Sequence, residues 1–193
     1  ICNSWGRIRG FKMKLLILIL MFSTNSYAYN FSVENQIILN TPESLREKSI
    51  KYVPMIVKVS QELNIDPYLA YSIAWTETHF NPRISSAGAN GLFQVMPSTK
   101  KWIKKKWGTE ISRIITGNME IYQKNPIDFE NIVLGLRYLK YLLNRFEEQK
   151  MAIIAYNMGP NYVASMIELN LGIGENHQYF KKISRRYKII AKN

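Results

Sequence analysis

Apolar residues recur every three or four positions along most of the chain, a spacing that predicts amphipathic helices. The clearest example begins at Asp128, where an apolar stripe indicates a helix face buried in the core. The stripe comprises Ile132, Leu136, Leu139, Leu143 and Phe146. No stretch keeps the two-residue alternation of a large sheet, so we expect a mainly α fold with at most a small β element.

A second helix is predicted from residue 67 to about residue 80. Asp66 suits the N-cap and Pro67 the first helical position, while Pro82 lies just beyond the end. The apolar face of this helix comprises Ala70, Ile73 and Ala74. Glu77 falls on the same face, so the helix that buries these three side chains also carries a carboxyl group toward the interior.

Residues 83–94 are rich in Ser, Gly, Ala and Asn, and any small hairpin should lie there. Gly88 and Gly91 can adopt backbone conformations that are closed to other residues. A short basic helix is predicted from residue 97 to about residue 107. Further helices are predicted at residues 150–157, 161–170 and 177 to about 190.

Length and composition limit what the chain can be. Its 193 residues, 47% of them hydrophobic, can bury one core, so we expect one domain. The single cysteine, Cys2, excludes a disulfide framework and cysteine-based chemistry in the body of the protein. His79 and His177 lack metal-ligand spacing and are interpreted as surface or helix residues, so no metal site is expected.

The formal net charge of +12, from 26 Lys and Arg against 14 Asp and Glu, suits a polyanionic partner. Nucleic acid, an anionic membrane and an acidic cell-wall polymer all fit that description. The basic residues form scattered groups, such as residues 104–106 and 185–186, without the interleaved aromatics of a nucleic-acid module. Such groups are typical of solvated helix faces, and we expect no nucleic-acid partner.

The first 28 residues are interpreted as an extension followed by a secretory signal peptide. Met13 and Lys14 precede an apolar run over residues 15–22, and Ser26 and Ala28 have the spacing that a signal peptidase accepts. The run is shorter than the roughly 20 apolar residues of a spanning helix, so an uncleaved anchor is the weaker alternative. The predicted organisation is an exported chain with a leader peptide at 1–28, a flexible segment at 29–42 and one domain at 43–193.

Glu77 is the residue whose chemistry most needs an explanation. A carboxylate without a partner is costly to bury, and the usual result is a raised pKa that keeps the group protonated near neutral pH. A protonated carboxyl group is a general acid and can protonate a glycosidic oxygen. The alternative is that Glu77 reaches solvent past a frayed helix end or pairs with Arg83.

A second catalytic carboxylate is not found near Glu77, because the next acidic residue along the chain is Glu110. A glycosidase with two carboxylates would need its second acid from farther away, with Asp128, Glu130 and Glu175 as candidates. Asp128 is better interpreted as a helix cap, and Glu130 as a favourable charge near a helix start. A mechanism with one carboxylate is therefore the simpler interpretation.

Four separated blocks of sequence resemble the soluble lytic transglycosylase (SLT) domain, a lysozyme-like family of peptidoglycan-cleaving enzymes. The blocks are ETHFNP at residues 77–82, GANGLFQVMPST at 88–99, ENIVLGLRYL at 130–139 and AYNMGP at 155–160. They occur in the order of the family and cover roughly residues 53–183. The resemblance implies a goose-type, lysozyme-like single domain and makes residues 43–193 an SLT catalytic domain.

The resemblance implies that Glu77 is the only catalytic acid/base. It would cleave the MurNAc–GlcNAc β-1,4 linkage and leave 1,6-anhydro-MurNAc ends, as a lyase that needs no cofactor. The implied partner is the glycan strand of peptidoglycan, and a secretion or cell-wall machinery complex is a further candidate. A monomer in the periplasm is expected, soluble or peripherally associated with the wall or membrane.

The resemblance also implies a set of substrate-binding residues. They are Ser85, Ser86, Gln94, Met96, Tyr156, Asn157 and Glu175. Gln94 and Met96 would line the sugar cleft, with plain core as the alternative for Met96. The Tyr156 hydroxyl would lie close to the catalytic carboxyl group. The serine loop is one residue shorter than usual, which leaves Ser85 and Ser86 open, with Ser85 favoured by its distance from Gly88.

Glu175 precedes the aromatic residue of the last helix, which is Tyr179 or Phe180, and could help to orient the site. Thr78, Phe93 and Met158 stand where the family usually has Ser, Met and Ala, changes that alter the shape of the pocket more than its chemistry. Two alternatives stay open: a lysozyme-like muramidase that uses water, and a non-catalytic wall-binding component of a secretion system.

Overall fold

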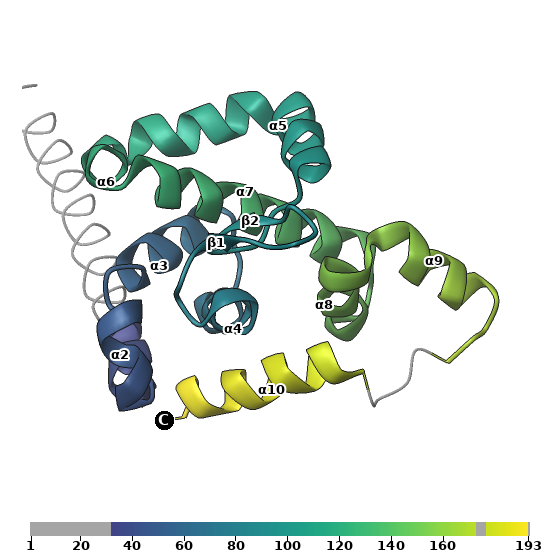
Figure 1. Cartoon of the computed structure of the whole chain (residues 1–193). Helices are drawn as coiled ribbons and strands as arrows, with labels where there is room; N and C mark the ends of the chain where they lie inside the picture. The colour runs from purple at the N-terminus through teal and green to yellow at the C-terminus, as the bar shows by residue number, and fades with distance from the viewer. Residues whose placement is uncertain (1–31, 173–176, 193) are drawn as a thin grey trace, which may run out of the picture.

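Helix α4 (Pro67–Thr78) lies in the middle of the structure, a computed structural model that describes residues 32–172 and 177–192 (Figure 1). The Asp66 side chain accepts a hydrogen bond of 2.8 Å from the Tyr68 amide, and Pro67 opens the helix, as predicted. Apolar and small side chains are buried on every side of α4, and its neighbours therefore cover it on all sides.

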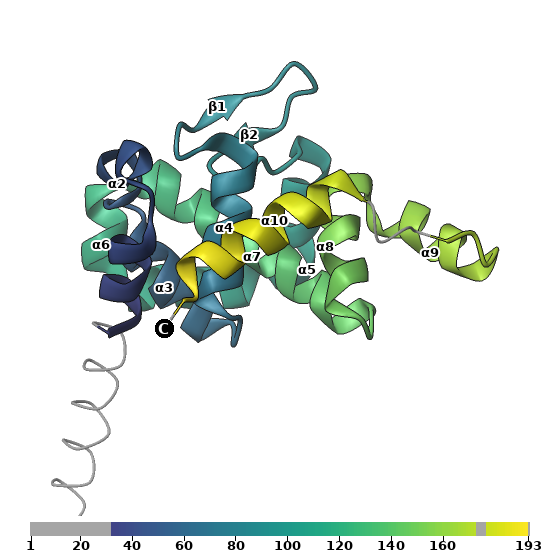
Figure 2. The same cartoon turned by 90° about the horizontal axis from the view of Figure 1, so that it is seen from below.

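The helices around α4 form the remaining layers (Figures 1 and 2). Helix α10 (Gln178–Ile190) packs along one side of α4, and α3 (Val53–Glu62) packs on another. The long helix α7 (Pro126–Arg145) contacts α3 and α8 (Gln149–Met158). Helix α9 (Pro160–Glu168) follows α8 and projects from the body.

Helix α7 bears the predicted apolar stripe. Ile132, Leu136 and Leu139 are fully buried, and Phe146 is nearly so. The helix begins at Pro126, two residues before the predicted start, and Asp128 lies in its first turn instead of capping it. The prediction of a mainly α protein is confirmed, and the described part of the chain holds a single small sheet.

That sheet is an antiparallel hairpin in the predicted segment. Strand β1 (Arg83–Ile84) pairs with β2 (Asn90–Gly91), with Arg83 opposite Gly91. Gly91 has a positive φ of 78°. A Cβ atom on Gly91 would lie 2.4 Å from the Asn131 side chain, so this position requires glycine for both backbone and space.

The helix that follows the hairpin is longer than predicted. Helix α5 (Pro97–Gly117) contains a non-helical residue at Trp107, where the prediction ended the helix, and then continues in a new direction. A short helix, α6 (Met119–Lys124), leads from α5 to α7 and was not predicted. At the kink, the Trp107 indole packs against Trp102 and under the Arg137 guanidinium.

The segment at residues 29–42 was predicted to be flexible, but most of the part that the structure describes is helical. Residues 32–40 are helical and precede α2 (Glu43–Ser49). Val33 and Ile37, one turn apart, are buried in the core. The Asn40 side chain also donates to the backbone carbonyl oxygens of Ile190 (3.0 Å) and Lys192 (2.8 Å), which ties this helix to the end of α10.

The predicted signal peptide lies outside the described residues. Within residues 32–172 and 177–192, no helix is both long enough and apolar enough to cross a membrane.

Candidate active site

Glu77 lies in the last turn of α4, where the chain turns sharply. The next residues past the helix, His79 and Phe80, have positive φ angles of 53° and 59°. Phe80 is buried, and its ring centroid lies 4.7 Å from that of Tyr71, so aromatic packing holds the turn in place. The helix therefore ends directly beyond Glu77 and leaves its side chain at the edge of the core.

The environment of Glu77 favours its protonated form. Burial raises the pKa of this carboxyl group above its usual value, and two weaker effects oppose the shift. The Tyr179 hydroxyl donates a hydrogen bond of 2.5 Å to Glu77 Oε1, and the positive charge of Arg83 acts in the same direction. Arg83 donates to the backbone carbonyl oxygens of Glu77 and Thr78, both at 3.4 Å, and makes no ion pair with the carboxylate among the described residues.

A cavity of about 660 Å³ opens beside this carboxyl group. Residues of α4, the end of α8 and the start of α10 line it: Thr76, Glu77, Asn157, His177, Gln178, Tyr179 and Lys182. Glu77 is the one acidic side chain among these described lining residues. The predicted residues Glu77 and Asn157 thus meet in the cavity, while Glu175 lies outside the described residues.

Tyr179 was not among the predicted site residues, although it makes the direct hydrogen bond to Glu77. Tyr156, which was predicted, donates its hydroxyl to the Phe93 carbonyl oxygen at 2.8 Å. Burial and the charge of Glu77 raise the pKa of both tyrosines well above the usual value. The two phenols therefore stay protonated beside the carboxyl group, and Tyr179 is its hydrogen-bond donor.

The loop between the hairpin and α5 carries the next predicted residues. Gln94 adopts a positive φ of 46°, and its Nε2 donates to the backbone oxygens of Arg83 and Gly91, both at 2.8 Å. The side-chain amide therefore closes the hairpin. Met96 is 39% exposed, which excludes the core alternative for it.

The two candidate serines have different environments. The Ser85 hydroxyl accepts a hydrogen bond of 3.0 Å from the Ala89 amide, and the Ser85 carbonyl oxygen accepts one from Gly88. Ser85 is thus part of the hairpin turn, whereas Ser86 is exposed. Neither serine is among the described residues that line the cavity beside Glu77.

Helix α7 holds the loop from behind through Asn131. Its Oδ1 accepts from the Phe93 amide at 2.8 Å, and its Nδ2 donates to the Asn90 carbonyl oxygen at 2.9 Å. One turn later, Gly135 leaves room for Phe93, because a Cβ atom there would lie 2.4 Å from Phe93 Cβ. Both residues belong to the third sequence block, but periodicity alone marks neither as part of a site.

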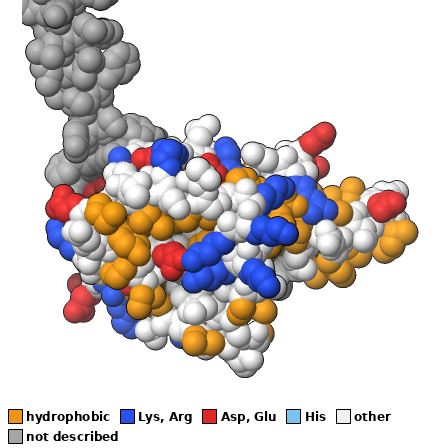
Figure 3. Space-filling view, turned by 90° about the horizontal axis from the view of Figure 1, so that it is seen from above, with side chains coloured by type: hydrophobic (Ala, Val, Ile, Leu, Met, Phe, Trp, Pro, Cys, Tyr) orange, Lys and Arg blue, Asp and Glu red, His pale blue; other side chains and the backbone are white. Residues whose placement is uncertain are grey.

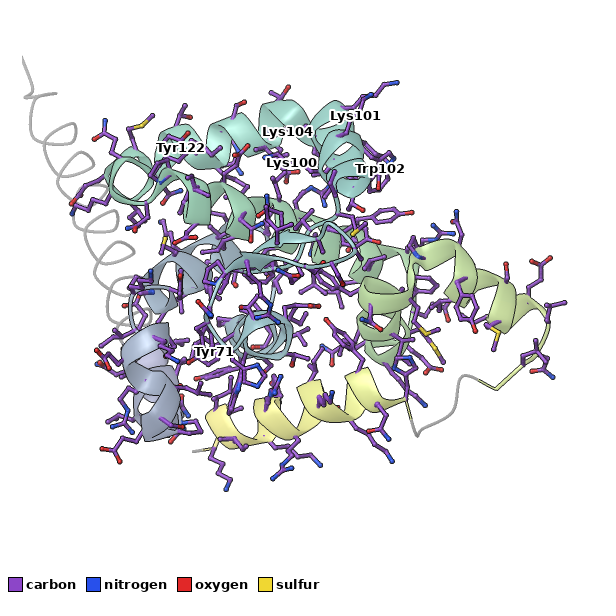
Figure 4. The ribbon with its side chains drawn as sticks, viewed as in Figure 1. Tyr71, Lys100, Lys101, Trp102, Lys104 and Tyr122 are labelled. Carbon is purple, nitrogen blue, oxygen red and sulfur yellow. The ribbon has the colours of Figure 1, made fainter. Side chains whose placement is uncertain are left out.

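Glu130, which was interpreted as a charge near a helix start, and the two histidines have partners in the structure. Glu130 pairs with Lys104 (2.5 Å) and Lys100 (3.5 Å), which face α7 from α5 (Figure 4). His79 accepts from Arg186 at 3.0 Å, and His177 lies 2.9 Å from the Met158 sulfur at the cavity wall. Among the described residues, no group of three or more His, Cys, Asp and Glu side chains could hold a metal ion.

Three comparisons place the chain among known proteins. A family model described as the transglycosylase SLT domain matches residues 54–178, more than half of the chain. Membrane-bound lytic murein transglycosylase C of Edwardsiella ictaluri is 31% identical over 184 residues, which cover 89% of this chain and 48% of that protein. Soluble lytic murein transglycosylase of Salmonella typhimurium is 27% identical over 154 residues, which cover 78% of this chain and 23% of that protein.

A solved structure of an inactive mutant of lytic transglycosylase Slt from Pseudomonas aeruginosa aligns with 70% of this chain and 21% of its own, at 21% identity and a TM-score of 0.48. The chain spans about half or less of the curated relatives that it matches. The SLT domain match covers α4 with Glu77, the hairpin, α7 and α8. The chain therefore belongs to the transglycosylase SLT domain family.

Proposed function

We propose that this protein is an exported peptidoglycan lytic transglycosylase that cleaves the MurNAc–GlcNAc β-1,4 linkage with Glu77 as its acid/base. The observation that carries the proposal is a half-buried carboxyl group whose pKa is raised by desolvation, the one acid among the described residues that line a cavity. Such a group can donate a proton near neutral pH, which a solvent-exposed glutamate rarely does.

In the first step, protonated Glu77 donates its proton to the oxygen that links MurNAc C1 to GlcNAc. The bond from C1 to this oxygen breaks, the GlcNAc portion leaves as an alcohol, and positive charge develops at C1. The N-acetyl group of MurNAc assists from the substrate. Glu77 is now a carboxylate.

In the second step, the Glu77 carboxylate removes a proton from the C6 hydroxyl of the same MurNAc, and that oxygen bonds to C1. The product is a 1,6-anhydro ring, and Glu77 regains its proton. Water is not consumed, and the substrate supplies the nucleophile. A second enzyme carboxylate is therefore unnecessary, in agreement with the composition of the described cavity wall.

The two effects on the Glu77 pKa suit these two steps. Burial favours the protonated acid that the first step needs, while the Tyr179 hydroxyl stabilises the carboxylate that the second step needs. Tyr179 thereby also fixes the direction of the carboxyl group, since its hydroxyl holds Oε1 at 2.5 Å.

Sugar binding is proposed for residues around this centre. Asn157 lies on the cavity wall, and exposed Met96 offers a thioether to a sugar ring. Gln94 and Tyr156 act on the backbone of the loop, which they hold beside Glu77. Ser85 shapes the hairpin turn. The relatives named as membrane-bound and soluble murein transglycosylases support peptidoglycan as substrate and an exported location.

The test is digestion of purified sacculi, followed by mass spectrometry of the released fragments. Fragments that carry 1,6-anhydro-MurNAc, one water lighter than reducing ends, are expected. Glu77→Gln should release them far more slowly, while Glu130→Gln serves as the matched control and should act like wild type. Reducing ends alone would identify a muramidase. Equal release by wild type and Glu77→Gln would remove Glu77 from the mechanism, and no release by wild type would favour a wall-binding protein.

A further inference from the structure

The outward face of α10 carries four cations in one row. They are Lys181, Arg185, Lys188 and, just past the end of the helix, Lys192. Their spacing of four, three and four residues keeps them on one side, and all four are exposed. The opposite side holds the buried residues Tyr179, Ile183 and Ile190, so the body cannot cover the row (Figure 2).

Three of the four cations, Arg185, Lys188 and Lys192, make no ion pair with another described residue. Helix α10 contains no Asp or Glu. On α5, in contrast, Lys100 and Lys104 pair with Glu130 of α7. Figure 3 shows acidic side chains among the basic ones on the face seen from above. Like charges three and four residues apart repel each other, so an anionic surface would relieve this repulsion.

Apolar side chains lie next to the row of cations. Half-buried Phe180 and Ile189 lie beside the cations and share a shallow cavity of about 450 Å³ with them. Beyond the N-terminal end of α10, the end of α9 exposes Leu169 (65%) and Leu171 (50%). The view from below shows α10 across the face and α9 extending past its end (Figure 2).

We propose that the outer face of α10, together with Leu169 and Leu171, docks on an anionic lipid membrane surface. The cations would contact lipid phosphates, and the leucines would enter the boundary of the acyl chains. A soluble polyanion would satisfy the cations alone and gives no role to two exposed leucines, whereas a bilayer interface accepts both groups. Tyr179, on the buried side of α10, and Lys182 line the Glu77 cavity, so α10 would stand between that cavity and the membrane.

The test is co-sedimentation of the full chain with vesicles of phosphatidylglycerol and phosphatidylcholine in equal parts, or of phosphatidylcholine alone. The triple variant Arg185→Gln, Lys188→Gln, Lys192→Gln should bind the anionic vesicles about 100-fold more weakly than wild type. A control with the same loss of charge, Lys48→Gln, Lys101→Gln, Lys105→Gln, should bind like wild type. The apolar run at residues 15–22 is present in every variant, and binding to vesicles of phosphatidylcholine alone measures its contribution.

A second variant, Leu169→Ser with Leu171→Ser, tests the apolar part and should lower binding to anionic vesicles about 10-fold. Thermal melts show whether each variant is folded, and all these positions are at the surface. An equal loss of binding in the α10 variant and the charge control would overturn the proposal, as would unchanged binding of the α10 variant. The proposal would also be overturned if the α10 variant kept its binding to vesicles but lost its binding to isolated glycan strands.

Discussion

Two glutamates on different helices have opposite environments. Glu77, at the end of α4, is half-buried with one tyrosine donor, and desolvation raises its pKa. Glu130, near the start of α7, is also desolvated by burial, but Lys104 and Lys100 outweigh that effect and lower its pKa. The difference lies in the side chains that contact the carboxylate, because Arg83 near Glu77 bonds to backbone oxygens instead.

In the proposed mechanism, this difference separates the carboxyl group that transfers protons from one that joins two helices. Glu130 is held in its charged form and joins α7 to α5, so it has no proton to donate near neutral pH. Glu77 can both release and accept a proton, because burial and the Tyr179 hydroxyl act on its pKa in opposite directions. Whether a carboxyl group can donate a proton therefore depends on the cations that contact it, which the number of carboxyl groups in a sequence does not reveal.

The largest expected effect is on catalysis. Glu77→Gln removes the proton donor and should lower the rate of release from sacculi by about 10²- to 10⁴-fold. Glu130→Gln removes the carboxylate that two lysines hold in its charged form, and it should leave the rate near that of wild type. Initial rates of anhydromuropeptide release measure both variants. A large loss in Glu130→Gln would show that the two carboxylates do not have separate roles.

The next effect concerns α7, which carries Glu130 and also supports the loop beside Glu77. Gly135→Ala would place a Cβ atom 2.4 Å from Phe93 Cβ and should lower the free energy of unfolding by about 1–3 kcal/mol. Gly108→Ala on α5 is the control, since no neighbouring atom lies within 4 Å of the added carbon. It should be neutral or slightly stabilising. Chemical denaturation of both variants gives the result, and equal destabilisation would contradict the close packing at Gly135.

A smaller effect should appear in Tyr179→Phe. The variant loses the hydrogen bond that stabilises the Glu77 carboxylate, so the pKa of Glu77 should rise further. Activity should fall about 10-fold, and the alkaline limb of the kcat/KM profile should move to higher pH. Tyr187→Phe on the same helix is the control, since that hydroxyl donates to Asp66 at 2.7 Å. An alkaline limb that stays in place in Tyr179→Phe would reduce Tyr179 to a packing residue.

The smallest effect is the contribution of Glu130 to stability. Its pKa is lowered in the folded state, so its ion pairs stabilise the fold above the pKa of the unfolded chain and are lost as pH falls through the lower folded value. Glu130→Gln should therefore cost about 0.2–1 kcal/mol near neutral pH and almost nothing in acid. Urea unfolding at several pH values measures this. A difference that grows toward acid pH would contradict the lowered pKa.

Patterns of residues close together in the sequence were sufficient to predict the helix and the hairpin that position Glu77. The Asp66 cap, the Pro67 start and the apolar spacing predicted α4, and glycine-rich composition predicted the hairpin. The stripe on α7 also followed from periodicity. These features depend on residues close together in the chain, and the structure confirms them.

Contacts between distant parts of the chain could not be predicted in this way. Tyr179 meets Glu77 across 102 positions, and only the packing of α10 on α4 brings them together. The helix at residues 32–40 is fixed by Asn40 and the end of α10, about 150 residues away. A buried tyrosine hydroxyl needs a partner, so the spacing of Tyr179, Ile183 and Ile190 on one face was the available signal.

The enclosure of α4 on all sides has a consequence for motion. Local opening of a helix inside the core disrupts packing on every side, so its amide hydrogens should exchange with solvent only when the whole molecule unfolds. The hairpin is mostly exposed and can open by itself. Glu77 thus lies at the end of a helix that is expected to open only with the whole fold, close to a hairpin that can open on its own.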